Sequence, residues 1–191
     1  MKVTFSVRNF YKRDGDQWLF RRLCADCGEV YVDSGVVGDE KSITQEMVRV
    51  RGDVNKTVKR AAEKLQSEGF YEPSLNEYSK VEVVVSFPGL SKEQAVELEW
   101  NVSDTLSEYT GYSGNGHPDY FESQMGVDGA KLTTYVFDAE SAIADLPEWF
   151  ANQLAHADVV ATIETGPGRL TRIWPPQRDF RHAMRVIGQK G

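Results

Sequence analysis

The sequence feature that most restricts the fold is the run VEVVVSF at residues 81–87. Successive β-branched residues of this kind are typical of a strand that lies at the centre of a sheet or is buried on both faces. The dipeptide Pro88-Gly89 closes the run. We therefore expect a central strand here, with the following segments arranged around it.

The segments after this strand alternate between helical and extended patterns. Ser91 can cap a helix with Gln94 three residues later, and apolar residues then recur at helical spacing. Asp128-Gly129 is a strong hairpin signal between two strand-like segments. The expected elements are a helix over 91–109, strands over 119–126 and 130–137, a helical region over 139–156 broken at Pro147, and a strand over 158–164. This β-α-β-β-α-β order predicts a ferredoxin-like α+β unit, with two helices on one face of a four-stranded antiparallel sheet.

The residues before this unit predict a smaller antiparallel sheet plus helix. Short strands rich in Val, Phe, Tyr and Thr are expected at residues 2–10, 17–24, 28–37 and 42–51. Asp53 can cap a helix that Gly69 ends. We divide the chain into a sheet-plus-helix domain over 1–72, a linker over 73–80, an acidic ferredoxin-like domain over 81–165, and a basic C-terminal strand and helix over 166–191.

Three segments of the first domain carry a family resemblance. They are Trp18 in an early strand, VYVDSGVVGDE at residues 30–40, and the helix end AAEKLQSEGFYE at residues 61–72. With these, residues 2–72 resemble the WGR domain, a sheet-plus-helix module of poly(ADP-ribose) polymerases and of many bacterial proteins. The resemblance implies the fold of that module.

The same resemblance bears on DNA binding. In the family the middle segment holds Trp-Gly-Arg, a hydrophobic residue and Gly, and its Trp and Arg contact a DNA end. Here Ser34 and Val36 stand at those two positions, although both glycines and the helix-end residues Lys64 and Gly69-Phe70 are kept. Serine cannot stack on a base and valine carries no charge, so we expect those contacts to be lost.

Charge is distributed unevenly along a chain whose formal net charge is −7. Residues 1–80 are nearly neutral, residues 81–165 hold 15 Asp and Glu against 2 Lys and Arg, and residues 166–191 hold 6 Lys and Arg against 1 Asp. An acidic block repels phosphates and speeds association with a basic protein. Acidic helix faces also serve solubility alone, and the basic tail can dock on the acidic block.

The helix expected over 91–109 is the candidate partner-binding element. Trp100 falls beside its apolar stripe, which favours a place at a sheet edge or on a binding surface. The candidate partner-binding residues are Glu97, Trp100, Asp104 and Glu108. The alternative hypothesis is a nucleic-acid-associated adaptor that binds DNA in a WGR-like way through Arg21, Arg22, Arg49, Arg51, Lys56, Lys59 and Arg60.

Other motifs carry little chemistry. Cys24 and Cys27 have the spacing of half a zinc site, but the chain has no further cysteine and its histidines lie in other segments, so they are only a weak metal candidate. His117-Pro118-Asp119 and the Gly-rich segment 113–116 are expected in a flexible loop between helix and strand. No nucleophile, base, metal or cofactor constellation can be assembled, so we expect neither an enzyme nor a cofactor.

The chain lacks both the roughly 20 consecutive apolar residues of a membrane span and a signal-peptide pattern at its start. Two cysteines so close together fit a reducing compartment. We therefore expect a cytoplasmic protein. The function hypothesis that these features favour is a non-catalytic protein-binding module of a bacterium or phage, of the inhibitor, immunity or accessory type, with duplex DNA as the alternative partner.

Overall fold

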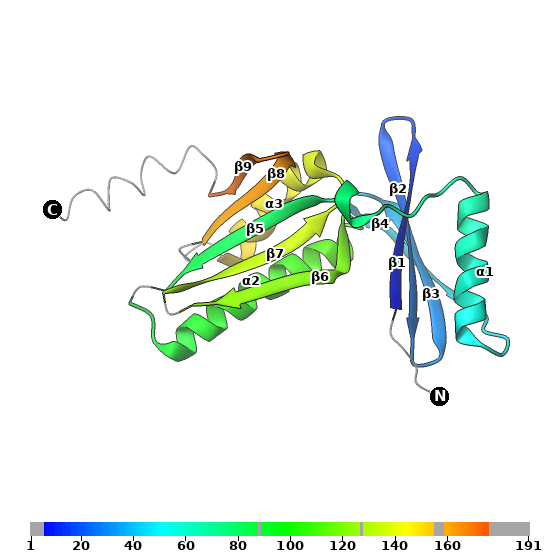
Figure 1. Ribbon diagram of the computed structural model, residues 1–191, viewed down its shortest axis with the longest axis horizontal. Coiled ribbons are helices and arrows are strands. Elements are labelled where there is room, and N and C mark those ends of the chain that lie inside the picture. Colours follow the sequence, from blue (N-terminus) through cyan, green and yellow to red (C-terminus); the bar gives the residue numbers. More distant parts are fainter. Residues whose placement is uncertain (1–5, 88, 127, 155–158, 176–191) are drawn as a thin grey trace.

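The computed structural model describes residues 6–87, 89–126, 128–154 and 159–175. These residues form two α+β units that lie side by side, joined by a short segment with one 3₁₀ turn, η1 (Leu75–Glu77) (Figure 1). Each unit contains one sheet, which we call sheet A and sheet B. The stretch expected as a polar linker therefore ends at the strand that begins with Ser79.

Sheet A is a four-stranded antiparallel meander in the order β1-β2-β3-β4. Its elements are β1 (Ser6–Asp14), β2 (Gln17–Asp26), β3 (Glu29–Val36), β4 (Asp39–Val48) and helix α1 (Val54–Ser67). Helix α1 lies on the side of the sheet away from the second unit (Figure 1). Asp53 caps it, accepting a hydrogen bond from the Lys56 amide at 3.1 Å. The expected sheet-plus-helix arrangement is confirmed.

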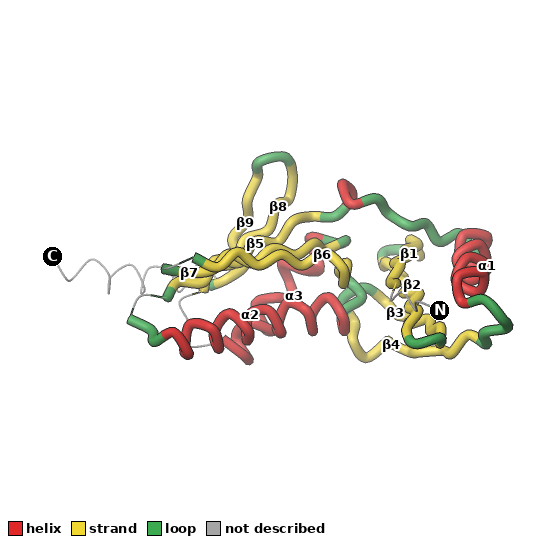
Figure 2. Tube along the Cα trace, turned by 60° about the horizontal axis from the view of Figure 1, so that its bottom comes forward, coloured by secondary structure: helices red, strands yellow, loops and turns green. Residues whose placement is uncertain are grey.

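Sheet B has five strands in the order β6-β7-β5-β8-β9, and every neighbouring pair is antiparallel. Its elements are β5 (Ser79–Ser86), α2 (Lys92–Tyr112), β6 (Gly116–Met125), β7 (Gly129–Val136), α3 (Ala139–Leu154), β8 (Val159–Gly166) and β9 (Arg169–Trp174). Helices α2 and α3 cover one face of the sheet (Figure 2). The expected central position of β5 and the expected hairpin are confirmed.

Two expectations about this unit are corrected. The sheet has a fifth strand, because β9 turns back at Gly168 and places Ile173 in the core. Helix α3 is not broken at Pro147 but continues through it. Proline removes a single amide donor, and the buried side chains Leu146 and Phe150 hold the helix on the sheet on both sides of it.

The central strand is buried on one face only. Val81, Val83 and Val85 are fully buried under the helices, whereas Val84 points to the other face and is 51% exposed. Alternate residues of a strand point to opposite faces, so the run 81–87 marks the middle of the sheet and not a strand covered on both sides. Sheet A differs in this respect, because β1 buries the adjacent residues Phe10 and Tyr11 on its two faces.

The two faces of sheet A have different partners. Phe10 and Leu23 belong to a cluster with α1. Tyr11 and Phe20 belong to a second cluster that also contains Phe137, after the last strand residue of β7. The second unit therefore covers the face of sheet A that α1 leaves open, and the two units share a core.

Candidate functional site

Helix α2 presents a large aromatic side chain to solvent. Its opposite stripe is buried, as expected, through Val102, Leu106 and Tyr109. Trp100 is 65% exposed, and Val96, one turn earlier, is 38% exposed. Burying a tryptophan from water is strongly favourable, so a tryptophan left largely in solvent on a well-packed helix marks a surface that can gain free energy by docking.

Carboxylates lie before and after this tryptophan on the same face of α2. Glu97 lies three residues before Trp100 and Asp104 four residues after it, so all three lie on one helix face. Glu97, Asp104 and Glu108 are exposed. Within the described part of the chain, Glu97 and Asp104 form no ion pair. We call Val96, Glu97, Trp100, Asp104 and Glu108 the α2 surface; the structure brings together the four residues that the sequence proposed and adds Val96.

The C-terminal end of α2 is bound by the first unit. Arg22 of β2 is only 7% exposed and donates from Nη2 to the Thr110 carbonyl at 2.6 Å and from Nη1 to the Gly111 carbonyl at 2.7 Å. The last carbonyls of a helix have no partner within it and carry partial negative charge. No basic residue lies in the last turn of α2 itself. Arg22 therefore supplies the cation that this helix end needs.

The segment after α2 is buried and not the flexible loop that the sequence indicated. Residues Ser113, Gly114, Asn115 and Gly116 are all buried. Gly38 donates to the Ser113 carbonyl at 2.8 Å, Tyr11 to that of Gly114 at 3.1 Å, and Asn9 to that of Gly116 at 2.7 Å. His117-Pro118-Asp119 likewise lies inside β6 and not in a loop. Polar groups buried between the units are thus paired, which makes the junction specific.

Asn115 binds the same segment to the rest of the second unit through hydrogen bonds. Its side-chain amide donates to the Tyr109 hydroxyl at 3.0 Å and to the Asp138 carbonyl at 2.8 Å, and its side-chain oxygen accepts from the Asp138 amide at 2.7 Å. Sequence reasoning missed this residue, because an Asn between two glycines is typical of an ordinary turn.

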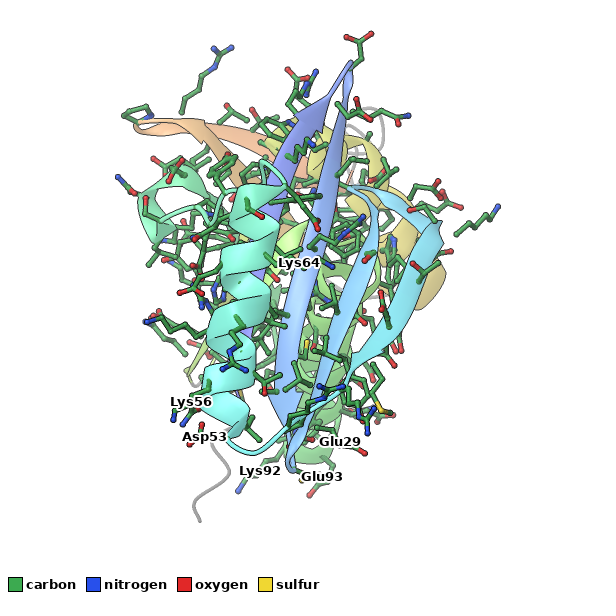
Figure 3. The ribbon with its side chains drawn as sticks, turned by 90° about the vertical axis from the view of Figure 1, so that its right-hand side faces the viewer. Glu29, Asp53, Lys56, Lys64, Lys92 and Glu93 are labelled. Atoms are coloured by element: carbon green, nitrogen blue, oxygen red, sulfur yellow. The ribbon has the colours of Figure 1, made fainter. Side chains whose placement is uncertain are left out.

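The basic residues proposed for nucleic-acid binding divide into two groups. Arg22 is buried at the junction, where it donates hydrogen bonds to the end of α2. Arg21, on the other face of β2, lies 5.1 Å from the centre of the Phe70 ring. The remaining five are exposed on α1 or in the segment before it: Arg49, Arg51, Lys56, Lys59 and Arg60. Figure 3 shows Lys56 and Lys64 on α1, on the side of the molecule away from the second unit. The seven residues do not form one surface.

The two cysteines lie at the tight turn between β2 and β3. Cys24 is half-buried in β2, and Cys27 is exposed with a left-handed φ of 47°. A hydrogen bond to Asp26 and the charge of that carboxylate raise the pKa of the Cys27 thiol, which disfavours the thiolate that metals and redox partners require. Among the described residues, no three His, Cys, Asp or Glu side chains are grouped so that they could hold a metal ion.

A cavity of about 450 Å³ lies between the β3–β4 turn, the C-terminal end of α2 and the middle of α3. Asp145, Glu148 and Trp149 of α3 line it together with Lys41. Burial, followed by the charges of Asp138 and Glu148, raises the pKa of Asp145. Crowded carboxylates of this kind favour bound protons or cations.

No family model, curated protein or solved structure matches this chain. Among the described residues, no helix is long and apolar enough to cross a membrane.

Proposed function

We propose that this protein is a non-catalytic binding module that docks through the α2 surface on a basic surface of another protein. The observation that carries the proposal is Trp100, which is 65% exposed between carboxylates on a helix whose other side is buried. An exposed aromatic side chain with carboxylates before and after it on the same helix face can supply both a desolvated contact and electrostatic steering. The rigid attachment of the α2 end to the first unit presents this surface in one orientation.

We also propose how the two units serve this function. The first unit acts as a WGR-like scaffold without DNA-end contacts, and the second as a ferredoxin-like unit extended by β9. Support for the second part comes from the order β6-β7-β5-β8 with both helices on one face. The class of binding protein that we propose is a bacterial or phage inhibitor, immunity or accessory protein in the reducing cytoplasm.

The experiment is affinity capture from the native cell with nuclease present. We expect the full chain to retain a partner that Trp100→Ala and the triple variant Glu97→Lys, Asp104→Lys, Glu108→Lys both lose. The matched control reverses three exposed carboxylates of the first unit, Asp16→Lys, Glu40→Lys and Glu46→Lys, which changes the net charge equally. Capture that the control weakens as much as the α2 variant would mean that overall charge, and not this surface, governs binding.

Association kinetics give a second test with the captured partner. Charge reversal on a steered interface slows association more than it speeds dissociation, whereas removal of the Trp100 ring should chiefly speed dissociation. Equal partner binding by all variants would return the carboxylates of α2 to a role in solubility.

DNA binding through α1 is the second candidate, because five exposed basic residues remain on and before that helix. Two basic residues of α1, Lys59 and Lys64, already form pairs with Glu63 and Glu68. Phosphate binding would weaken steeply with salt, with a slope of about 0.9 per neutralised phosphate on duplex DNA. Salt-sensitive duplex binding that the triple variant Lys56→Ala, Lys59→Ala, Arg60→Ala abolishes would establish this candidate.

A further inference from the structure

A second cavity opens between the two units and contains none of the residues of the α2 surface. Its volume is about 600 Å³, within the range of about 300 to 1,000 Å³ that is typical of sites for small organic ligands. Residues near the β1–β2 turn line it on one side, and the start of α3 together with the β8–β9 hairpin line it on the other. Clefts between packed units are frequent places for ligands.

One wall of this cleft is apolar and held in place. Trp18, Phe137 and Ile143 line it and are half-buried, so part of each side chain is left uncovered. The Phe137 ring stacks on Tyr11 with centroids 3.7 Å apart, and the Trp18 ring meets Phe137 edge-on at 5.0 Å. Because Tyr11 is fully buried in the shared core, this aromatic wall is fixed before any ligand arrives, which lowers the entropic cost of binding.

Two arginines, one from each unit, line the same cleft. The Arg13 guanidinium lies 5.2 Å from the centre of the Trp18 ring, and its Nε donates to the Gly15 carbonyl at 3.0 Å. Arg169 is exposed at the start of β9. Within the described residues neither arginine forms an ion pair. Both guanidinium groups therefore keep donors that can reach a ligand from the rim of the cleft.

Two acidic residues, Asp138 and Glu140, also line the cleft, and they differ in how far they offset the positive charge of the arginines. The Asp138 carboxylate accepts from the Glu140 amide at 3.0 Å and from the Ser141 hydroxyl at 3.1 Å at the start of α3, so its charge is directed into the helix end. Glu140 is exposed and lines the cleft. The cleft is therefore lined by two guanidinium groups, those of Arg13 and Arg169, and by one carboxylate directed to solvent, that of Glu140.

We propose that this cleft binds a small amphipathic carboxylate, with an aromatic or branched apolar body against Trp18, Phe137 and Ile143 and the carboxylate between Arg13 and Arg169. Guanidinium groups match carboxylates in shape and charge, and the aromatic wall accepts a flat ring. This site is independent of docking at the α2 surface.

The probe is 2-naphthoate, titrated into the full chain and followed by proton–nitrogen correlation NMR through the Trp18 indole signal. The neutral isostere 2-naphthamide serves as the matched ligand. We expect the Trp18 signal and the backbone amides of Ala139 and Thr165 to shift. Arg13→Ala and Arg169→Ala should each weaken the affinity about three- to tenfold, a range set by partly solvated charged hydrogen bonds.

Three further measurements decide the chemistry of the site. Naphthamide should bind more weakly than naphthoate, by a factor similar to the loss caused by removing one arginine. Glu140→Gln should strengthen naphthoate binding. Lys92→Ala, which removes an exposed cation outside the cleft, should leave naphthoate binding unchanged. Arg169→Ala tests the charge without disturbing the packing of Arg13 on Trp18. An unmoved Trp18 signal, equal affinity for acid and amide, or variants that bind like the original chain would each overturn the proposal.

Discussion

At the scale of the residue, several side chains have roles that depend on a distant segment. Phe20 lies against two glycines, and a Cβ on Gly114 would sit 2.2 Å from its Cε1 atom, whereas one on Gly35 would sit 2.9 Å from the same atom. Gly35 and Gly114 thus leave space for a ring that packs on the second unit. The sequence alone could not show why position 35 is a glycine, because the ring that needs the space belongs to another strand.

The first prediction concerns Gly114, whose φ is +66°. Gly114→Ala should lower the free energy of unfolding by the cost of a left-handed alanine plus about 1 to 3 kcal/mol for overpacking against Phe20. Gly15→Ala is the matched control, because its φ is +57° and no atom lies within 4 Å of the added Cβ. Urea unfolding of both variants measures the difference. Equal destabilisation would show that Phe20 moves aside without cost.

The second prediction uses the raised pKa of Asp145, which burial and the charges of Asp138 and Glu148 cause. A carboxyl with a raised folded-state pKa holds its proton more tightly when folded, so ionisation destabilises the fold as pH rises above the unfolded pKa of about 3.9. Asp145→Asn should therefore be more stable than the original chain at pH 7, and the gain should vanish in acid. Unfolding curves across pH test this; an equal gain at every pH would point to packing instead of charge.

At the scale of the element, the sequence predicted most of the architecture because local patterns carry it. The hydrophobic stripe of α2, its capping box and the central strand β5 were all expected and are observed. Strand β9 was not expected as part of sheet B, since pairing with β8 depends on register and not on composition. The cap of α2 was also missed, because Arg22 lies almost ninety residues earlier in the chain and its position in β2 indicated only a basic surface residue.

The third prediction follows from this cap. Arg22→Met leaves the carbonyls of Thr110 and Gly111 without their buried donor, which should cost about 1 to 3 kcal/mol of stability. Hydrogen exchange should become faster in the last turn of α2. Arg21→Met, on the opposite face of the same strand, should cost about 1 kcal/mol or less, because it loses a contact with the Phe70 ring at a half-buried site. Similar exchange at the α2 end in both variants would contradict the capping role.

At the scale of the whole molecule, contacts between the two units determine how the charged surfaces are arranged. The distribution of charge along the sequence could not predict these contacts. The division of the sequence into a near-neutral and an acidic domain left open whether the two pack together. In the structure the first unit contributes Asn9, Tyr11 and Arg22 to the segment that follows α2. The basic residues of α1 and the acidic residues of α2 consequently belong to one body, with the aromatic cluster of Tyr11, Phe20 and Phe137 between them.

The last prediction is that the two units unfold together. The cluster at the junction contains the fully buried Tyr11, and the polar groups around it are paired across the units, so separating them exposes apolar surface and strands buried donors and acceptors. Neither unit should then be stable when the other is unfolded. Calorimetry should give a single transition with equal calorimetric and van't Hoff enthalpies.

Hydrogen exchange offers an independent measurement, because the slowest amides of β2 and of β5 should open with the same free energy. The Gly114→Ala variant should lower the opening free energy of both sets of amides by the same amount. Two transitions in the original chain, or a β2 that opens far more readily than β5, would mean that the units are only loosely docked and that the α2 surface is presented by the second unit alone.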